Sequence, residues 1–237
     1  MNSQAFQQVG TGAATMTLQG VINKTLILLG VLVASAGLAW GNLATLQEHL
    51  MALSIGAFIG GMVLAFITYS KPEIASFTAP LYCILKGILL GVVSAFAEAM
   101  FPGIVINAII LTFGILFFML MAYKNGYIRA TPKLQKILMF GLGAYFFLII
   151  ANLIMGLFGS GIPSIFGSGP IGIGFSVLIV AMAGFFLILD FDQIEQSIRA
   201  GAPKQLEWLS AFGLMVTLIW LYLEVLKLLM KLQSSDD

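Results

Sequence analysis

The sequence predicts an all-α protein that crosses a membrane as a bundle of seven helices. Of its 237 residues, 60% are hydrophobic and only 9% are charged, whereas a soluble domain is roughly 45–50% apolar and about 25% charged. The apolar residues form long continuous windows and do not alternate with polar ones, which excludes the strands of a membrane β-barrel. This composition argues against a soluble enzyme domain, a disordered chain and a nucleic-acid-binding protein, and the formal net charge of +1 recruits no nucleic acid.

Seven apolar windows follow one another along the chain, and each approaches the roughly 20 residues that a helix needs to cross hydrocarbon. The predicted spans are 25–41, 50–69, 79–100, 104–123, 137–158, 171–191 and 209–230. Polar or turn-forming segments separate them, among them Lys71-Pro72-Glu73, Pro102-Gly103 and the charged loop 124–136. The longest polar connection is 192–207, before the last span.

The chain is predicted to contain one membrane domain, residues 24–231, between two short tails. The N-terminal tail, 1–23, is polar and carries no charge before Lys24, so it lacks the basic region and apolar core of a secretory signal. The C-terminal tail is 232–237. No internal repeat and no soluble domain are recognisable. Glycines four residues apart, Gly37/Gly41, Gly56/Gly60 and Gly87/Gly91, are expected to let helices approach closely.

The distribution of Lys and Arg predicts the orientation. With the N-terminus inside, the inner side holds eight basic residues and the outer loops hold none. The eight are Lys24, Lys71, Lys124, Arg129, Lys133, Lys136, Arg199 and Lys204. Seven crossings place the C-terminus outside. A re-entrant last span would instead return the C-terminus, with Lys227 and Lys231, to the inner side.

Four charged residues fall inside the predicted spans: Lys86, Glu98, Asp190 and Glu224. An ionised group at the centre of a bilayer costs roughly 2.5–3.5 kcal/mol on insertion scales, so such residues are candidates for function. Glu98 is interpreted as an interfacial carboxylate reaching outer water. Lys86 either extends to the inner interface or pairs with a buried acid.

The two remaining acids have open interpretations. Asp190 is either a residue at a helix end or a deeper functional acid. Glu224 either pairs with Lys227 three residues along the same helix, lies near the outer interface, or is a carboxylate facing the protein interior in a polar pathway.

Other motifs carry no chemistry. Gly167-Ser168-Gly169-Pro170-Ile171-Gly172 has the glycine spacing of a dinucleotide-binding turn, but no strand precedes it and a membrane span follows. His49 is the single histidine and has no nearby second ligand. Cys83 is the single cysteine, so an intrachain disulfide and a cysteine metal cluster are excluded. No catalytic motif is present. The chain is therefore not expected to be an enzyme or to need a cofactor.

The last two spans resemble a known family. The residues that carry the resemblance are Leu189-Asp190-Phe191-Asp192-Gln193-Ile194-Glu195, Gly201-Ala202-Pro203-Lys204 and Thr217-Leu218-Ile219-Trp220-Leu221-Tyr222-Leu223-Glu224. Upstream, Ala79-Pro80-Leu81-Tyr82, Gly87 to Gly91 and Phe101-Pro102-Gly103-Ile104-Val105 add to it. Together they are similar to the bacterial branch of the Bax inhibitor-1-like family.

The resemblance implies a seven-helix bundle with the last helix central, and a pH-sensitive calcium leak gated by an acidic pair on helices six and seven. Asp190 and Glu224 take the two acidic positions and would bind calcium weakly and transiently. A basic residue late in span two latches the pair in some members. Here Tyr69 stands at that place and Lys71 follows two residues later, so Lys86 is a candidate substitute.

Geometry sets a condition on that pair. If the last span entered the membrane at Trp208, Glu224 would lie about 24 Å from that face and could not reach Asp190. The two can meet only if helix seven starts in the cytoplasm or if helix six runs on past Asp192, and we expect both. They would then share a proton and titrate as a coupled pair, with the protonated pair tying the two helices together.

Two other expectations complete the prediction. The alternative function is that of a regulatory protein in the lipid bilayer, which binds a membrane protease or another membrane protein, with the N-terminal tail as its handle. A proton-coupled transporter is a weaker rival because no inverted repeat is present. The expected location is the bacterial cytoplasmic (inner) membrane.

Overall fold

A computed structural model of the chain describes residues 15–46, 49–159 and 162–236. These residues are almost entirely helical. The elements are α1 (Leu18–Gly41), α2 (Leu43–Leu46), α3 (Leu50–Ser70), η2 (Pro72–Ile74), α4 (Ala75–Met100), α5 (Ile104–Lys124), α6 (Pro132–Leu157), α7 (Pro163–Phe166), α8 (Pro170–Arg199) and α9 (Leu206–Asp236). Within the described ranges, β pairing is limited to one isolated antiparallel bridge between Thr15 and Pro203.

The described residues contain seven helices that are long and apolar enough to cross a membrane. They are α1, α3, α4 with η2, α5, α6, α8 and α9, and each corresponds to one predicted window. The predicted fold class, an all-α polytopic bundle, is therefore confirmed.

Several helices extend beyond the predicted windows at their polar ends. α1 begins at Leu18 because the Thr17 hydroxyl accepts a hydrogen bond from the Gly20 N–H (3.0 Å) and caps the first turn. α8 continues to Arg199, through the first half of the segment that was predicted to be a polar connection. Polar side chains can leave the hydrocarbon without interrupting the helix, so hydropathy marks the membrane-embedded part and not the helix end.

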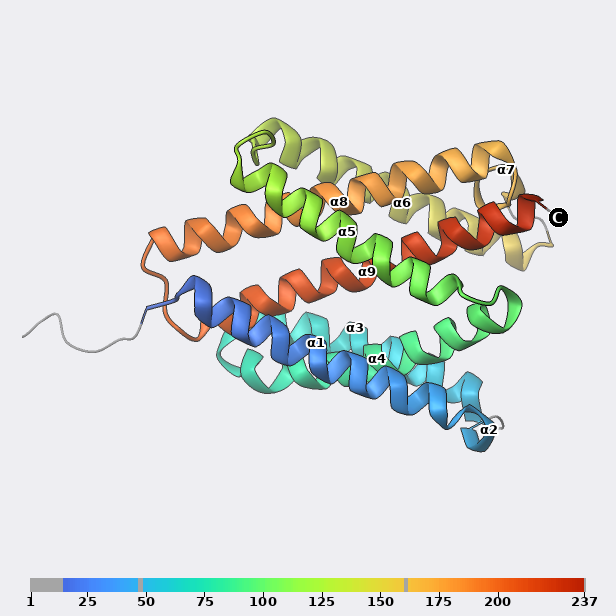
Figure 1. Ribbon diagram of the computed structural model, residues 1–237, viewed down its shortest axis with the longest axis horizontal. Helices are drawn as coiled ribbons and strands as arrows, with labels where there is room; N and C mark the ends of the chain where they lie inside the picture. Colours follow the sequence, from blue (N-terminus) through green and yellow to red (C-terminus); the bar gives the residue numbers. More distant parts are fainter. Residues whose placement is uncertain (1–14, 47–48, 160–161, 237) are drawn as a thin grey trace, which may run out of the picture.

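The last helix is central, as expected. In Figure 1, α9 runs through the middle of the bundle. Its main packing partners are α8, α1, α5 and α4. In α9, 56% of the most apolar window is buried inside the protein, against 11% in both α3 and α6. α3 packs mainly on α4, and α6 mainly on α8, at the periphery.

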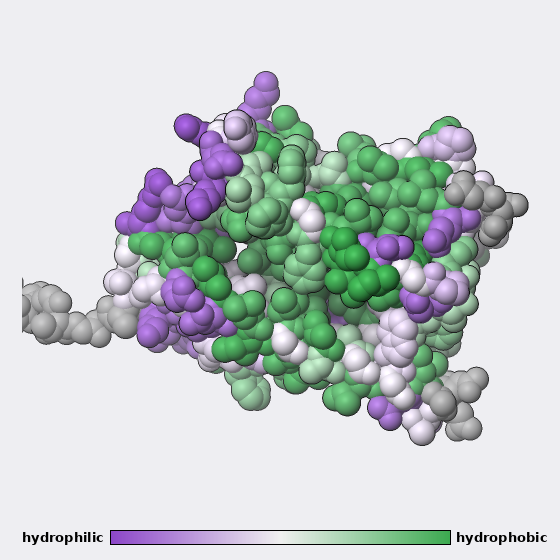
Figure 2. All heavy atoms as spheres, in the orientation of Figure 1, coloured by the Kyte–Doolittle hydropathy of each residue, from purple (hydrophilic) through white to green (hydrophobic). Residues whose placement is uncertain are grey.

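The bundle has one basic end. This name is used here for the start of α1 and the loops after α3, α5 and α8, all of which lie at the left of Figure 1, where Figure 2 shows a concentration of hydrophilic residues. α9 is one continuous helix of 31 residues, about 46 Å long, and runs from the basic end to the opposite end (Figure 1). A re-entrant last span is therefore wrong.

The glycine pairs behave differently from one another. A Cβ at Gly87 or Gly91 on α4 would overlap Ser35 or the Ala36 carbonyl on α1, so this pair does bring two helices together. A Cβ at Gly37 or Gly41 on α1 would meet nothing within 4 Å. The prediction that Gly37 and Gly41 pack against another helix is thus wrong.

Candidate functional site

Asp190 lies beside a small cavity between α3, α8 and α9. The cavity has a volume of about 50 Å³, which is enough to hold water. Its polar lining consists of Asp190 and Gln193 from α8, Tyr69 from α3 and Ser210 from α9, with Gly213 beside them. The site is built where three helices meet, on the half of α9 that is nearer the basic end.

One oxygen of Asp190 has no hydrogen-bond partner. Asp190 Oδ2 is buried and unpartnered within the described part of the chain. The Thr217 side chain on α9 is a polar neighbour of the same carboxyl group. The cavity lining includes no Lys, Arg or His among the described residues. A buried carboxylate without a counter-charge is unfavourable, so this group is prepared to take up a proton, water or a cation.

The three latch candidates occupy different places. Tyr69 lines the Asp190 cavity, and its ring packs edge-on against Phe212 at a centroid distance of 5.2 Å. Lys71 follows the last turn of α3 and is exposed. Lys86 points toward α3, with Nζ at 5.1 Å from the Phe58 ring centroid. Of the three candidates, only Tyr69 lies beside Asp190. Tyrosine is not basic, so none of the three places a basic side chain beside this carboxylate.

Lys86 forms no ion pair within the described residues. Its ammonium group also lies 5.7 Å from the Tyr82 ring centroid, so aromatic faces stabilise it in place of a carboxylate. The predicted pairing of Lys86 with a buried acid is therefore wrong in this structure.

Glu224 is buried, and one of its two carboxylate oxygens has several partners. The residue is 4% exposed, and Oε1 accepts three hydrogen bonds. The donors are the Tyr145 hydroxyl on α6 (2.7 Å), the Trp220 indole (3.2 Å) and the Lys227 ammonium (2.8 Å). Two of the interpretations of Glu224 therefore hold together: it pairs with Lys227, and it also faces the protein interior.

Asp190 and Glu224 do not meet. α8 and α9 are antiparallel, with Lys231 Nζ donating to the Gly172 carbonyl (3.1 Å) at one end and Ile194 and Leu209 lining one cavity at the other. This register places Glu224 level with Ile179. Eleven residues separate Ile179 from Asp190, which corresponds to about 16 Å along the helix.

The prediction that Asp190 and Glu224 lie close enough to share a proton is therefore wrong. Helix six does run past Asp192, and helix seven does start before Trp208, as the pair would require. Antiparallel packing nevertheless fixes the two carboxylates at different depths, and neither change in helix length alters that register.

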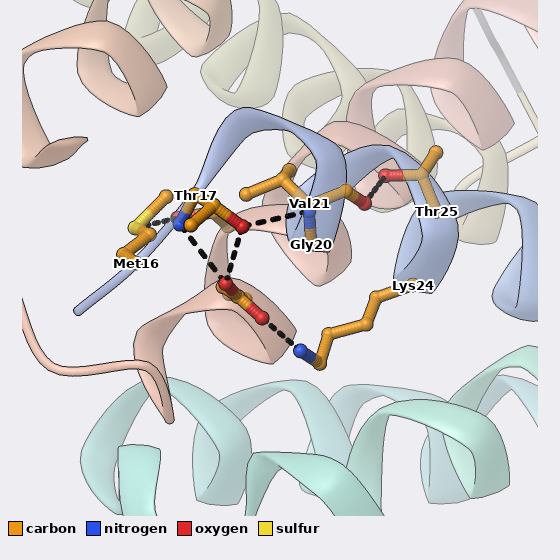
Figure 3. A network of polar contacts seen from close by, with 8 residues as sticks. Met16, Thr17, Gly20, Val21, Lys24 and Thr25 are labelled. Carbon is orange, nitrogen blue, oxygen red and sulfur yellow. Dashed lines mark hydrogen bonds and ion pairs between the residues drawn. The ribbon is translucent and has the colours of Figure 1, made fainter. Parts of the chain in front are cut away.

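A third buried carboxylate, Glu207, was not recognised as a site residue. It is 0% exposed at the start of α9, and it forms an ion pair with Lys24 on α1. Its Oε1 also accepts hydrogen bonds from the Thr17 N–H (2.9 Å) and the Thr17 hydroxyl (3.1 Å). Figure 3 shows Thr17, Gly20 and Lys24 gathered around this contact. No sequence spacing identifies partners 183 residues apart.

The same contact fastens the start of the chain to the α8–α9 loop. A Cβ at Gly20 would overlap the Glu207 carboxyl group, so glycine is required there for close approach. The Met16 N–H donates to the Ala202 carbonyl (2.8 Å), and Lys24 Nζ lies 5.6 Å from the Trp208 ring centroid. Residues 15–24 are thus part of the folded bundle, whereas residues 1–14 of the predicted tail lie outside the described residues.

Three further acids, Glu98, Asp192 and Glu195, have structural partners. Glu98 accepts hydrogen bonds from the N–H groups of Gly103 (2.6 Å) and Val105 (3.1 Å) and so caps the start of α5. The Tyr123 hydroxyl on α5 contacts both Glu195 (2.5 Å) and Asp192 (3.3 Å) on α8. These contacts explain why acidic residues near span ends need not be functional.

The described residues contain no cluster of three or more His, Cys, Asp or Glu side chains that could hold a metal ion. At the Asp190 cavity, a hard cation would find one carboxylate together with the oxygens of Ser210, Gln193 and Tyr69. This ligand set is much smaller than the six to eight oxygens that calcium prefers. Any cation held there would keep water ligands and exchange readily.

Comparisons with known proteins agree with the overall architecture. Neither the curated proteins nor the solved structures contain a match to this chain. The family model described as Bax inhibitor 1 like matches residues 1–234. With seven apolar helices, of which α9 is the central one, this chain belongs to the Bax inhibitor 1 like family of membrane proteins.

Proposed function

We propose that this protein is a pH-sensitive calcium leak channel in which Asp190 alone is the sensor. The observation that supports this proposal is the unpartnered Oδ2 of Asp190 beside a cavity that can hold water. In its charged form the carboxylate attracts a cation into the cavity. Once protonated it is neutral and no longer does so.

A leak requires weak binding, because an ion that is held by a complete ligand cage does not leave. One carboxylate and a few neutral oxygens from Tyr69, Gln193 and Ser210 meet this requirement. Calcium would therefore pass this site down its gradient, and protons would compete with it for Asp190. Flux should fall as the pH falls.

Glu224 has a separate place in the proposed pathway. It lies about 16 Å further along α9, and in the present conformation Lys227 neutralises it. The Lys227 side chain is 52% exposed, so it can turn away from the carboxylate without leaving a buried cavity. We assign Glu224 as a second transient calcium contact that becomes available only when Lys227 moves.

The proposal is tested by calcium flux into liposomes containing the purified protein, measured at pH 8. Wild type should exceed empty liposomes, and Asp190→Asn should return the rate close to that of empty liposomes. Asp192→Asn is the matched control, because it makes the same chemical change two residues away, in a side chain bonded to Tyr123 and Gln196. Equal rates for wild type and Asp190→Asn would overturn the proposal.

The alternative is a regulatory protein that binds a membrane protease or another membrane partner. The attachment of Thr15 and Met16 to the α8–α9 loop favours it, because this attachment holds the first described residues at the basic end of the bundle. Deletion of residues 1–14 should then abolish partner binding and leave calcium flux unchanged. We further propose that the basic end faces the cytoplasm of a bacterial cell and that the protein lies in its inner membrane.

A further inference from the structure

A groove between α1 and α5 is left unfilled by the protein. Both helices pack on α9, and they form the walls of a partly open cavity of about 400 Å³ whose floor is α4 and α9. Figure 2 shows a largely hydrophobic surface on the face that α1 and α5 occupy. The volume lies in the range of roughly 300–1,000 Å³ that is typical of small-ligand sites.

The polar side chains of the groove are already satisfied. Ser94 and Tyr222 on the floor bond to each other through their hydroxyl groups (2.6 Å), and the Thr112 hydroxyl on the α5 wall donates to the Ala108 carbonyl of its own helix (2.7 Å). The rest of the lining is apolar or glycine. Nothing in the groove calls for water or for a polar ligand, so an occupant must be a hydrocarbon.

The α1 wall is hollowed by small residues. A Cβ at Gly37 or Gly41 would meet nothing within 4 Å, although both glycines line the groove. On the neighbouring face of the same helix, Ser35 and Ala36 contact the glycines of α4 closely. The groove therefore lies beside the face of α1 that packs closely on α4.

The length and depth of the groove match one lipid chain. On α1 it extends from Leu29 to Gly41, which is about 18 Å, a little more than half of the roughly 30 Å hydrocarbon core. Gly41 ends α1 on the side opposite the basic end. Trp40 lies at this mouth, where indole rings favour the membrane interface.

We propose that this groove is a binding site for one acyl chain of a phospholipid from the leaflet opposite the basic end. The chain enters beside Trp40 and lies along Gly37 and Val33 toward Leu29. The assignment is independent of the calcium proposal, because none of the groove residues lines the Asp190 cavity.

Native mass spectrometry of the detergent-washed protein tests this inference, with phosphatidylcholine as the added lipid. Wild type should retain one phospholipid per chain, and Gly37→Leu, which fills the groove, should lose it. Gly30→Leu is the matched control. Gly30 is two turns away on the same face of α1, a Cβ at this position would meet nothing within 4 Å, and the residue does not line the groove.

A second variant keeps the test decisive if Gly37→Leu does not fold. Val33→Phe enlarges a side chain that already lines the groove and is 61% exposed, so it should also remove the lipid without disturbing helix packing. The inference is overturned if wild type retains no lipid, or if the folded variants retain as much as wild type. Loss of lipid in Gly30→Leu alone would also contradict it.

Discussion

The two buried carboxylates of α9, Glu207 and Glu224, differ from Asp190 on α8, which faces α9 between them. Glu207 at the start of α9 has Lys24 and Thr17 as partners, and Glu224 toward the far end has Lys227 and Tyr145. Asp190 faces α9 between these two positions and has neither a lysine nor a bonded tyrosine among the described residues. The comparison shows that this fold can neutralise a buried acid, so the unpartnered Oδ2 of Asp190 is a distinctive feature of the site.

The difference between Asp190 and the two acids of α9 should disappear if a lysine is introduced beside Asp190. Ser210→Lys places an ammonium group at the edge of the cavity, where two opposite charges about 4 Å apart attract by ~4 kcal/mol at an effective dielectric constant of about 20. Calcium flux at pH 8 should fall by at least roughly tenfold, since each 1.4 kcal/mol changes an equilibrium tenfold.

Ser210→Met is the control for this variant, because methionine is similarly long and uncharged. It should retain clearly more flux than Ser210→Lys. Equal fluxes in the two variants would mean that blocking the cavity, and not neutralising Asp190, stops the ion.

A second variant removes the lysine partner of Glu207 at the start of α9, so that this acid resembles Asp190. Lys24→Met leaves a buried carboxylate with only the Thr17 hydrogen bonds. Removing one partner of a fully buried pair costs roughly 3–5 kcal/mol. We expect about 2 kcal/mol here, because Lys24 lies at the end of the bundle, and hence a Tm that is lower by roughly 4–8 °C.

Two further variants sharpen this measurement of Tm in detergent. Adding Glu207→Gln to Lys24→Met should recover part of the loss, because the buried charge is then gone. Arg199→Ala breaks the exposed pair with Glu195 and should leave the Tm unchanged. A Tm for Lys24→Met equal to that of wild type would refute the role given to this ion pair.

The smallest effect is expected at Glu224, which has three donors. Tyr145→Phe removes one of them and the link from α6 to α9, at a cost of about 1 kcal/mol or roughly 2–4 °C in Tm. Tyr127→Phe changes the same atom on a side chain that is 83% exposed and should have no effect. If the two variants were equally stable, the Tyr145–Glu224 bond would contribute nothing.

Composition and hydropathy were sufficient to predict the seven helices, whereas the central place of the last helix was implied by the resemblance to the Bax inhibitor-1-like family. The lipid environment demands about 20 apolar residues per crossing, and the chain meets that demand in seven places. Helix ends were harder to predict. The Asp192–Arg199 segment is polar because it leaves the hydrocarbon, yet it remains helical.

The site was only partly predictable. Single charges inside apolar windows indicated Asp190 and Glu224 as candidates for function, although the depth of Asp190 was left open. The resemblance drew attention to Tyr69 late in span two, and Tyr69 does line the Asp190 cavity. The distance between the two acids could not be predicted, because it depends on the register of α8 against α9. The Lys24–Glu207 pair joins the first and last spans, and nothing local in the sequence connects them.

The central claim is that Asp190 exchanges a proton for calcium without a partner carboxylate. The most direct test is the ratio of liposome calcium flux at pH 8 to that at pH 6 in wild type, Asp190→Asn and Glu224→Gln. We predict a several-fold ratio in wild type, a ratio near one in Asp190→Asn, and a ratio that stays close to the wild-type value in Glu224→Gln. A wild-type pH profile in Asp190→Asn, or loss of the profile in Glu224→Gln alone, would contradict the account.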